Sequence, residues 1–260
     1  AKRRVFANFV SPNAFAGRLL LLLPLITHSL VTGATRLTPP SRWVISGTLA
    51  AASIGCLFWT GSKSGWLIAL VLFAVTALRF IPWRKVRWLV AGVVGVAGLA
   101  GFLVTFAPYF RAGATSLSAR ADYWRAATST ALGNPWLGTG PGTFGKAYAE
   151  IKHPDSEMTH LVHNDYLEQA SDSGWVAFAC YVAFWLLVLW GSARSVLTGG
   201  DRGRFVVWLG LLGWCLQGVS EYHLYVPALS WPAFFFAGWL LARQSASTAG
   251  LGSPTVSAKV

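Results

Sequence analysis

The fold is decided by one long polar stretch, residues 118–174, which reads SARADYWRAATSTALGNPWLGTGPGTFGKAYAEIKHPDSEMTHLVHNDYLEQASDSG. This stretch holds seven of the nine acidic residues of the chain. The sequence on both sides of it consists of apolar runs close to the length that crosses a bilayer. We therefore expect two groups of membrane spans, with the polar chemistry of the protein concentrated between them.

Composition places the chain among membrane proteins, because 54% of its residues are hydrophobic and only 12% are charged. Hydropathy and turn residues predict an all-α, polytopic membrane helical bundle with about seven transmembrane helices and one long helical extracytoplasmic loop. The predicted organisation is residues 1–107 for four spans, 108–174 for the loop, 175–242 for three spans and 243–260 for a disordered cytoplasmic tail. The expected spans are 14–34, 43–60, 65–81, 88–107, 175–193, 205–220 and 225–242.

Basic residues cluster in short loops and predict the orientation of the spans. Arg84, Lys85 and Arg87 lie between the third and fourth spans, and Arg202 and Arg204 lie between the fifth and sixth. Because short cytoplasmic loops carry an excess of Lys and Arg, both loops are expected in the cytoplasm and the long polar loop on the outer side. The segment 2–4 and Arg18 break this pattern, since the same count places them outside.

A net charge of +12 would suggest nucleic acid for a soluble domain, but here the cations flank apolar spans. Orientation and contact with anionic membrane lipid explain them more simply, so no nucleic-acid partner is expected. Cys56, Cys180 and Cys215 lie inside apolar runs without metal-ligand spacing and are expected to be packing residues. The start at Ala1 suggests the C-terminal part of a larger protein.

The polar loop is expected to be folded. Residues 118–132 have helical spacing that ends at Gly133, Asn134 and Pro135, and helical spacing returns from His163 to Gly174. Residues 138–142 resemble a phosphate-binding loop, but no strand precedes them and no Gly-Lys-Ser/Thr follows. They are therefore interpreted as a tight turn.

Several motifs together resemble the bacterial O-antigen ligase and O-antigen polymerase superfamily. These are Phe9–Ala16 with Pro12 and Asn13, Thr60–Gly65 around Lys63, the run from Arg120 through Asn134-Pro135 to Phe144, and His163-Asn164 ahead of Gly174. Two positions depart from the family pattern: Lys63 stands where Arg is usual, and Ala179 stands where the ligase motif has a second glycine. The resemblance implies an inverting, metal-independent glycosyltransferase of the bacterial inner (cytoplasmic) membrane, with its active site facing the periplasm.

The resemblance implies that His163 is the catalytic base, which takes the proton of an acceptor hydroxyl. The alternative for His163 is a surface or hydrogen-bonding histidine of the loop. Arg120 is expected to bind the diphosphate of the donor, with Lys63, Asn164 and Arg4 as further substrate-binding residues. Arg120 could instead be a solvated residue or a partner of Asp122, and Lys63 an interfacial lysine.

Other polar residues receive weaker assignments. His153, His160 and His163 with Asp155 and Glu157 lack the i, i+4 spacing of metal ligands on a helix face, and the family resemblance implies no essential metal, so no metal site is expected. No other cofactor is expected. Glu221 and His223 could line a path for the acceptor, although an interfacial polar turn is the simpler interpretation. Arg18 is a secondary site candidate because a cation within a span is costly unless it faces the bundle interior.

The expected function is transfer of a glycan from a polyprenyl-diphosphate carrier to an acceptor hydroxyl on a saccharide or a lipid-linked acceptor, as in O-antigen ligases. The alternatives within the superfamily are an O-antigen or exopolysaccharide polymerase and a protein O-oligosaccharyltransferase. A transporter of lipid-linked saccharide is the alternative of a different class. Its key charges are expected near the membrane midplane, often with repeats, and the sequence has neither feature.

Overall fold

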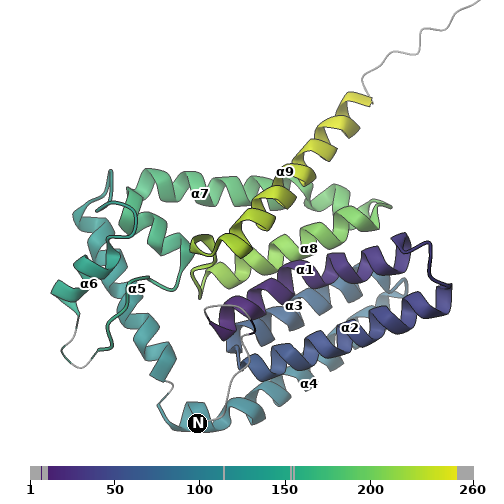
Figure 1. The fold of residues 1–260 in the computed structure, drawn as a ribbon, viewed down its shortest axis with the longest axis horizontal. Helices are drawn as coiled ribbons and strands as arrows, with labels where there is room; N and C mark the ends of the chain where they lie inside the picture. The colour runs from purple at the N-terminus through teal and green to yellow at the C-terminus, as the bar shows by residue number, and fades with distance from the viewer. Residues whose placement is uncertain (1–6, 8–10, 114, 153, 155, 251–260) are drawn as a thin grey trace, which may run out of the picture.

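The computed structural model describes residue 7 and residues 11–250 except 114, 153 and 155, with no side-chain description after residue 242. This part of the chain is all-helical, and Figure 1 shows its helices packed side by side as a bundle with a helical cap at one end. The elements are α1 (Pro12–Gly33), α2 (Pro39–Thr60), α3 (Lys63–Phe80), α4 (Arg84–Arg111), α5 (Thr115–Gly133), α6 (Phe144–Ile151), α7 (Asp165–Thr198), α8 (Arg202–Gly218), the 3-10 helix η1 (His223–Tyr225) and α9 (Pro227–Gly250).

Local sequence signals explain where the first helices begin. Ser11 caps α1 by accepting a hydrogen bond from the amide of Ala14 at 3.0 Å, and Pro12 follows it at the start of the helix. Thr38 caps α2 before Pro39 in the same way. Prolines suit the first helical positions because no hydrogen bond from their nitrogen is needed there. The helix starts are thus fixed by residues that can be read from the sequence.

The long helices alternate in direction through the bundle. In Figure 1, α1, α3, the second part of α7 and α9 run one way, whereas α2, α4 and α8 run the other way. Five of the helices, α1, α2, α3, α4 and α7, are long and apolar enough to cross a membrane. The chain is therefore a multi-pass membrane protein, and the predicted polytopic all-α bundle is confirmed.

Helix α8 forms the centre of the bundle. It contacts α1, α3, α7 and α9, and large side chains such as Phe205, Leu211 and Trp214 are buried. Gly210 allows α8 to approach α1 closely, because a Cβ at this position would lie 2.2 Å from the carbonyl oxygen of Leu21. With only 17 residues, α8 is shorter than the five spanning candidates, and the described apolar part of α9, Pro227–Ala242, is also shorter.

The polar segment between α4 and α7 has a small core of its own. Tyr123 and Ala127 of α5 pack with Phe144 and Tyr148 of α6 and with Val162. Burial and a hydrogen bond donated to Asp122 raise the pKa of Tyr148 to about 12. The expectation that this segment is folded was correct, and its first helix extends slightly beyond the predicted range of 118–132. Helix α6 was not anticipated.

The glycine-rich turn and the kink in α7 fit together. Helix α7 changes direction at Gly174, which has φ 80° and ψ 175°, and a Cβ there would lie 2.4 Å from the carbonyl oxygen of Trp136. The amides of Gly140 and Gly142 donate to the backbone oxygen and a carboxylate oxygen of Asp172, at 2.9 and 2.7 Å. These amides hold the polar segment on α7, as expected for a structural turn.

The C-terminal end differs from the expected organisation. Helix α9 continues to Gly250, so residues 243–250, predicted to begin a disordered tail, are helical. The physical reason is that neither proline nor glycine interrupts this stretch before Gly250. The remainder of the predicted tail, residues 251–260, lies outside the described residues.

Candidate active site

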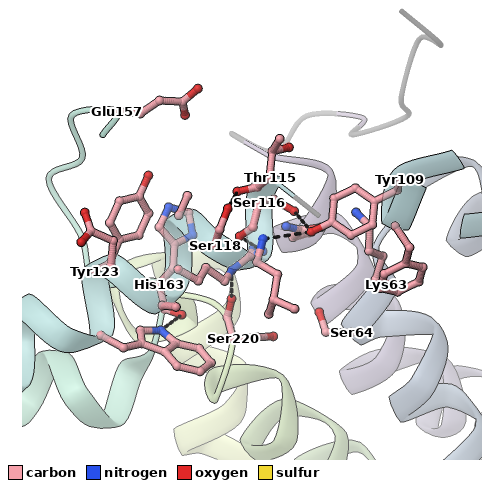
Figure 2. A pocket seen from close by; sticks show the side chains of 18 of the residues that line it. Lys63, Ser64, Tyr109, Thr115, Ser116, Ser118, Tyr123, Glu157, His163 and Ser220 are labelled. Atoms are coloured by element: carbon pink, nitrogen blue, oxygen red, sulfur yellow. Dashed lines mark hydrogen bonds between the residues drawn. The ribbon is translucent and has the colours of Figure 1, made fainter. Parts of the chain in front are cut away.

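A cavity of about 1130 Å³ opens where the polar segment meets the end of the bundle. Figure 2 shows Lys63 and Tyr109 on one side of it and Tyr123 and His163 on the other. Arg120 of α5 also lines it. Lys63 and His163, which are 100 positions apart in the sequence, therefore share one cavity.

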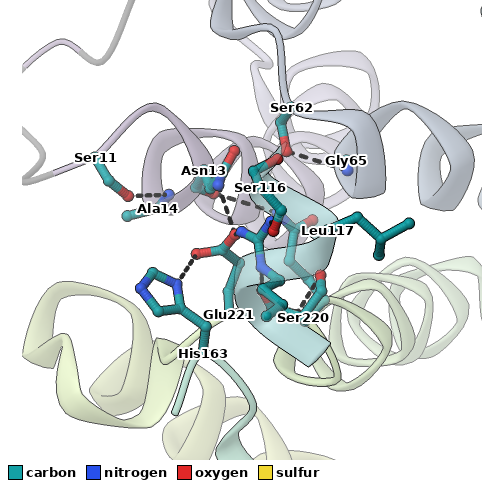
Figure 3. A network of polar contacts seen from close by, with 12 residues as sticks. Ser11, Asn13, Ala14, Ser62, Gly65, Ser116, Leu117, His163, Ser220 and Glu221 are labelled. Atoms are coloured by element: carbon teal, nitrogen blue, oxygen red, sulfur yellow. Dashed lines mark hydrogen bonds and ion pairs between the residues drawn. The ribbon is translucent and has the colours of Figure 1, made fainter. Parts of the chain in front are cut away.

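Glu221 does not line the cavity itself, but its side chain contacts three residues that do. Its carboxylate is only 2% exposed, and Oε1 accepts from both Arg120 and Asn13 at 2.5 Å (Figure 3). The other oxygen, Oε2, lies 3.6 Å from Nδ1 of His163. The backbone oxygen of Glu221 accepts from the amide of Asp165 at 3.2 Å, which joins the α8–η1 turn to the start of α7.

His163 is held in an unusual backbone conformation. Its φ is 56°, in the left-handed region that non-glycine residues rarely adopt. The ring stacks on Tyr123, with centroids 5.9 Å apart, and meets the edge of Tyr222 at 4.8 Å. Trp124 donates its indole N–H to the carbonyl oxygen of His163 at 3.4 Å. Backbone strain of this kind persists where surrounding contacts determine the conformation, and it is common at functional sites.

One side of the His163 ring is accessible from the cavity, and the other side, with Nδ1, is buried. The side chain is 27% exposed, while its buried Nδ1 makes no hydrogen bond within the part of the chain that the structure describes. Glu221 Oε2 faces Nδ1 at 3.6 Å, just beyond hydrogen-bond distance. An Nδ1–H directed at Glu221 leaves the Nε2 atom as the proton acceptor of the ring.

Arg120 is fixed by partners on both sides of the site. Its Nε donates to the carbonyl oxygen of Ser220 at 3.1 Å, and Nη1 donates to that of Ser116 at 3.5 Å. Its ion-pair partner is Glu221, whereas Asp122 pairs with Arg125. Hydrogen bonds to the Asp122 carboxylate lower its pKa, the largest effect coming from Ser156. The alternative that Arg120 pairs with Asp122 was therefore wrong.

Lys63 lies at the start of α3, directly after its N-cap, Ser62. Its Nζ atom is 3.7 Å from the centre of the Tyr109 ring, in a cation–π contact. The Tyr109 hydroxyl in turn accepts from the amide of Leu117, in the first turn of α5, at 2.9 Å. Lys63 and the positive N-terminal end of α5 thus occupy the same side of the cavity.

The other predicted site residues have different surroundings. Asn164 is the N-cap of α7, and its Oδ1 accepts from the amides of Tyr166 and Leu167, both at 3.0 Å. A structural role therefore accounts for this side chain. Arg4 lies outside the described residues. Arg18 of α1 does not line the cavity; it lines a second groove together with residues of α9.

Two residues outside the predicted site also contact it in the structure. Glu221 and Asn13 meet His163 and Arg120, although Glu221 had been interpreted as part of an interfacial turn. A usable signal was that Glu221 is one of only two acidic residues outside the polar stretch. Among the described residues, no group of three or more His, Cys, Asp or Glu side chains is arranged to hold a metal ion.

His223 is buried two residues after Glu221, against Gly17 of α1. A Cβ at Gly17 would lie 2.3 Å from the imidazole ring, so only glycine fits there without movement of the histidine. Burial lowers the pKa of His223 to about 4. The ring therefore remains neutral near pH 7 and does not provide a cation for the site.

Comparison with known proteins identifies the family of the chain. A family model described as O-antigen ligase matches residues 48–182, which is half of the chain. The match includes Lys63, Arg120 and His163, whereas Asn13 and Glu221 lie outside it. A search of curated proteins finds no match. The chain belongs to the O-antigen ligase family of ligase- and polymerase-type membrane enzymes.

Proposed function

We propose that this protein transfers a glycan from a polyprenyl-diphosphate carrier to an acceptor hydroxyl, with His163 as the general base. The observation that carries the proposal is the meeting of His163, Arg120 and Lys63 around one cavity, with the buried carboxylate of Glu221 facing the first two. A base and two cations are the groups that this displacement requires.

The acceptor hydroxyl loses its proton to Nε2 of His163 as its oxygen attacks the anomeric carbon. The bond from that carbon to the diphosphate oxygen breaks at the same time, and the leaving diphosphate takes the electron pair. Attack opposite the leaving group inverts the anomeric centre. Glu221 accepts a hydrogen bond from Nδ1–H and stabilises the imidazolium as it forms, while the acceptor proton is carried by Nε2.

The leaving group gains negative charge as its bond to the sugar breaks. The guanidinium of Arg120 can bind two phosphate oxygens at once. Lys63 adds a compact positive charge, and the amides at the start of α5 add the positive end of a helix dipole. These three groups lie on the side of the cavity where we propose that the diphosphate binds.

The proposed location of the reaction is the outer face of the bacterial inner membrane. The opposite end of the bundle carries the basic residues that flank its short loops: Arg36, Arg42, Arg79, Arg84, Lys85, Arg87, Arg194, Arg202 and Arg204. The positive-inside rule assigns that end to the cytoplasm, so the cavity faces the periplasm. A site at one end of the bundle also favours an enzyme over a transporter with a midplane site.

The test is transfer from a purified polyprenyl-diphosphate glycan by His163→Ala, with His160→Ala as the matched control. His160 is an exposed histidine of the same segment that does not line the cavity. We expect His163→Ala to lose transfer while inserting normally into membranes, and His160→Ala to keep it. Retained transfer in His163→Ala would refute the assignment. A panel of lipid-linked, saccharide and protein acceptors distinguishes ligase, polymerase and protein oligosaccharyltransferase.

A further inference from the structure

One carboxylate, that of Glu221, is shared by the proposed base and the proposed diphosphate-binding cation. Its Oε1 accepts from Nη2 of Arg120 at 2.5 Å, and its Oε2 lies 3.6 Å from Nδ1 of His163. Figure 3 shows the side chain of Glu221 between those of His163 and Asn13. In this conformation the carboxylate is therefore hydrogen-bonded to the arginine and lies just beyond hydrogen-bond distance of the imidazole.

The shared carboxylate is buried, whereas the two groups that it joins reach the cavity. The side chain of Glu221 is 2% exposed, and those of Arg120 and His163 are 18% and 27% exposed. Arg120 and His163 both line the cavity, and Glu221 does not. A ligand in the cavity can therefore contact the arginine and the histidine, while the carboxylate lies behind them.

A buried carboxylate needs a positive group beside it, and Glu221 has two candidates. While Arg120 pairs with it, an imidazolium ion at His163 gains less from the same negative charge. Phosphate oxygens that bind the guanidinium compete with Glu221 for its N–H donors and its charge. The charge of Glu221 is then balanced best by an imidazolium ion at His163.

We propose that binding of the donor diphosphate to Arg120 turns the Glu221 carboxylate over to His163, so that His163 becomes an effective base only after the donor has bound. This donor-dependent activation rests on the proposed glycan transfer and adds an order to it: the diphosphate binds first, and the acceptor proton is taken second. Asn13 donates to Oε1 of Glu221 at 2.5 Å and holds that oxygen while the pairing of the carboxylate changes.

Other titratable groups near this site do not join the diphosphate to the base in the same way. Two interact with Glu221 and two contact the His163 ring, and these are Asp165, His223, Tyr123 and Tyr222. Asp165 and His223 do not line the cavity, and burial lowers the pKa of His223 to about 4. Burial raises the pKa values of both tyrosines, which are therefore neutral near pH 7.

The experiment uses the full protein in nanodiscs, with isotope-labelled nitrogen in its five histidines and inorganic pyrophosphate as the probe. Nitrogen chemical shifts of His163, assigned by their loss in His163→Gln, report the ratio of imidazolium to neutral imidazole at a fixed pH near 7. Saturating pyrophosphate should raise this ratio at least about fivefold in the wild type, which is the lower end of the usual coupling between two sites.

Two variants separate the role of Glu221 from a direct effect of the added anion. Glu221→Gln should lose most of the response to pyrophosphate. Arg125→Gln is the matched control and should keep it, because Arg125 also lines the cavity but pairs with Asp122. The signal of the buried His223 shows whether each variant is folded. No response in the wild type, or an equal response in Glu221→Gln, would overturn the proposal.

Glycan transfer by the same preparation distinguishes this inference from the proposed function. Transfer without a response of His163 to pyrophosphate contradicts the donor-dependent activation alone. A response of His163 without transfer to any acceptor supports the change of partner of Glu221 and contradicts the proposed function.

Discussion

Glu221→Gln isolates the proposed electrostatic contribution of the buried carboxylate. The substitution preserves the size of the side chain and leaves a carbonyl oxygen that can accept from Asn13 and Arg120. It removes the negative charge 3.6 Å from Nδ1 of His163. The contacts of the site are retained, and the main change is the energy of forming an imidazolium ion there.

The expected size of the effect follows from the distance between the two groups. Two unit charges 3.6 Å apart attract by about 1 kcal/mol in water and about 5 kcal/mol at an effective dielectric constant of 20. The lower part of this range applies, because the His163 ring is 27% exposed and Arg120 shares the carboxylate. A loss of about 1–2 kcal/mol corresponds to a fall in kcat of roughly fivefold to thirtyfold.

The assay is steady-state transfer with a saturating acceptor and varied polyprenyl-diphosphate glycan, which gives kcat and KM for the donor. Glu221→Gln is expected to lower kcat, since the imidazolium forms in the transition state. Glu157→Gln is the matched control, because Glu157 also lines the cavity but is exposed, whereas the described carboxylate that pairs with His163 is that of Glu221. Wild-type kcat in Glu221→Gln, or an equal loss in Glu157→Gln, would refute the role of the carboxylate.

Three further variants or conditions test other parts of the account. Arg120→Lys keeps the charge but loses the planar fork, so KM for the donor should rise at least about tenfold in the transfer assay. Gly174→Ala should destabilise the protein by at least about 3 kcal/mol in thermal unfolding, because its φ is 80° and the new Cβ would clash with the backbone of Trp136. Burial lowers the pKa of His223 to about 4, so the folded protein favours the neutral ring. The free energy of unfolding therefore has its full value above about pH 6.5 and falls by about 3 kcal/mol as the pH drops to 4.

Each of these predictions has a result that contradicts it. An unchanged donor KM in Arg120→Lys argues against bidentate binding of the diphosphate. Gly191→Ala is the control, because nothing outside the helix backbone lies within 4 Å of the new Cβ, and it should have little effect on stability. Equal stability of the two variants argues against a requirement for glycine at the kink of α7. For the histidine, the acid-dependent loss of stability should shrink in His223→Gln, and an identical loss in that variant excludes His223 as its source.

Apolar length and turn residues allowed most of the bundle to be predicted. The expected spans correspond to helices because their sequence signals are local: Pro12 and Pro39 at helix starts, and Gly61 in a left-handed conformation after α2. The eight-residue helix α6 was missed because one or two turns give too short a pattern of apolar residues. The continuation of α9 beyond residue 242 was missed because composition alone suggested disorder.

The cavity could be predicted only in part. Counting spans placed Lys63 on the same side of the membrane as Arg120 and His163, and these residues do line one cavity. The role of Glu221 depends on a contact across 58 residues to His163, which no local pattern encodes. The capping role of Asn164 was present in the sequence, because Asn is a preferred N-cap residue, but the family motif led to a substrate-binding assignment for this side chain instead.

Glycan transfer by this protein can be tested by a balance of products with the purified protein in liposomes. Labelled glycan on polyprenyl diphosphate is supplied at the outer face together with a hydroxyl-bearing acceptor. The proposed glycan transfer predicts one mole of covalently glycosylated acceptor for each mole of polyprenyl diphosphate released. Movement of the intact lipid-linked glycan across the bilayer, with no covalent product on any acceptor tested, would contradict it.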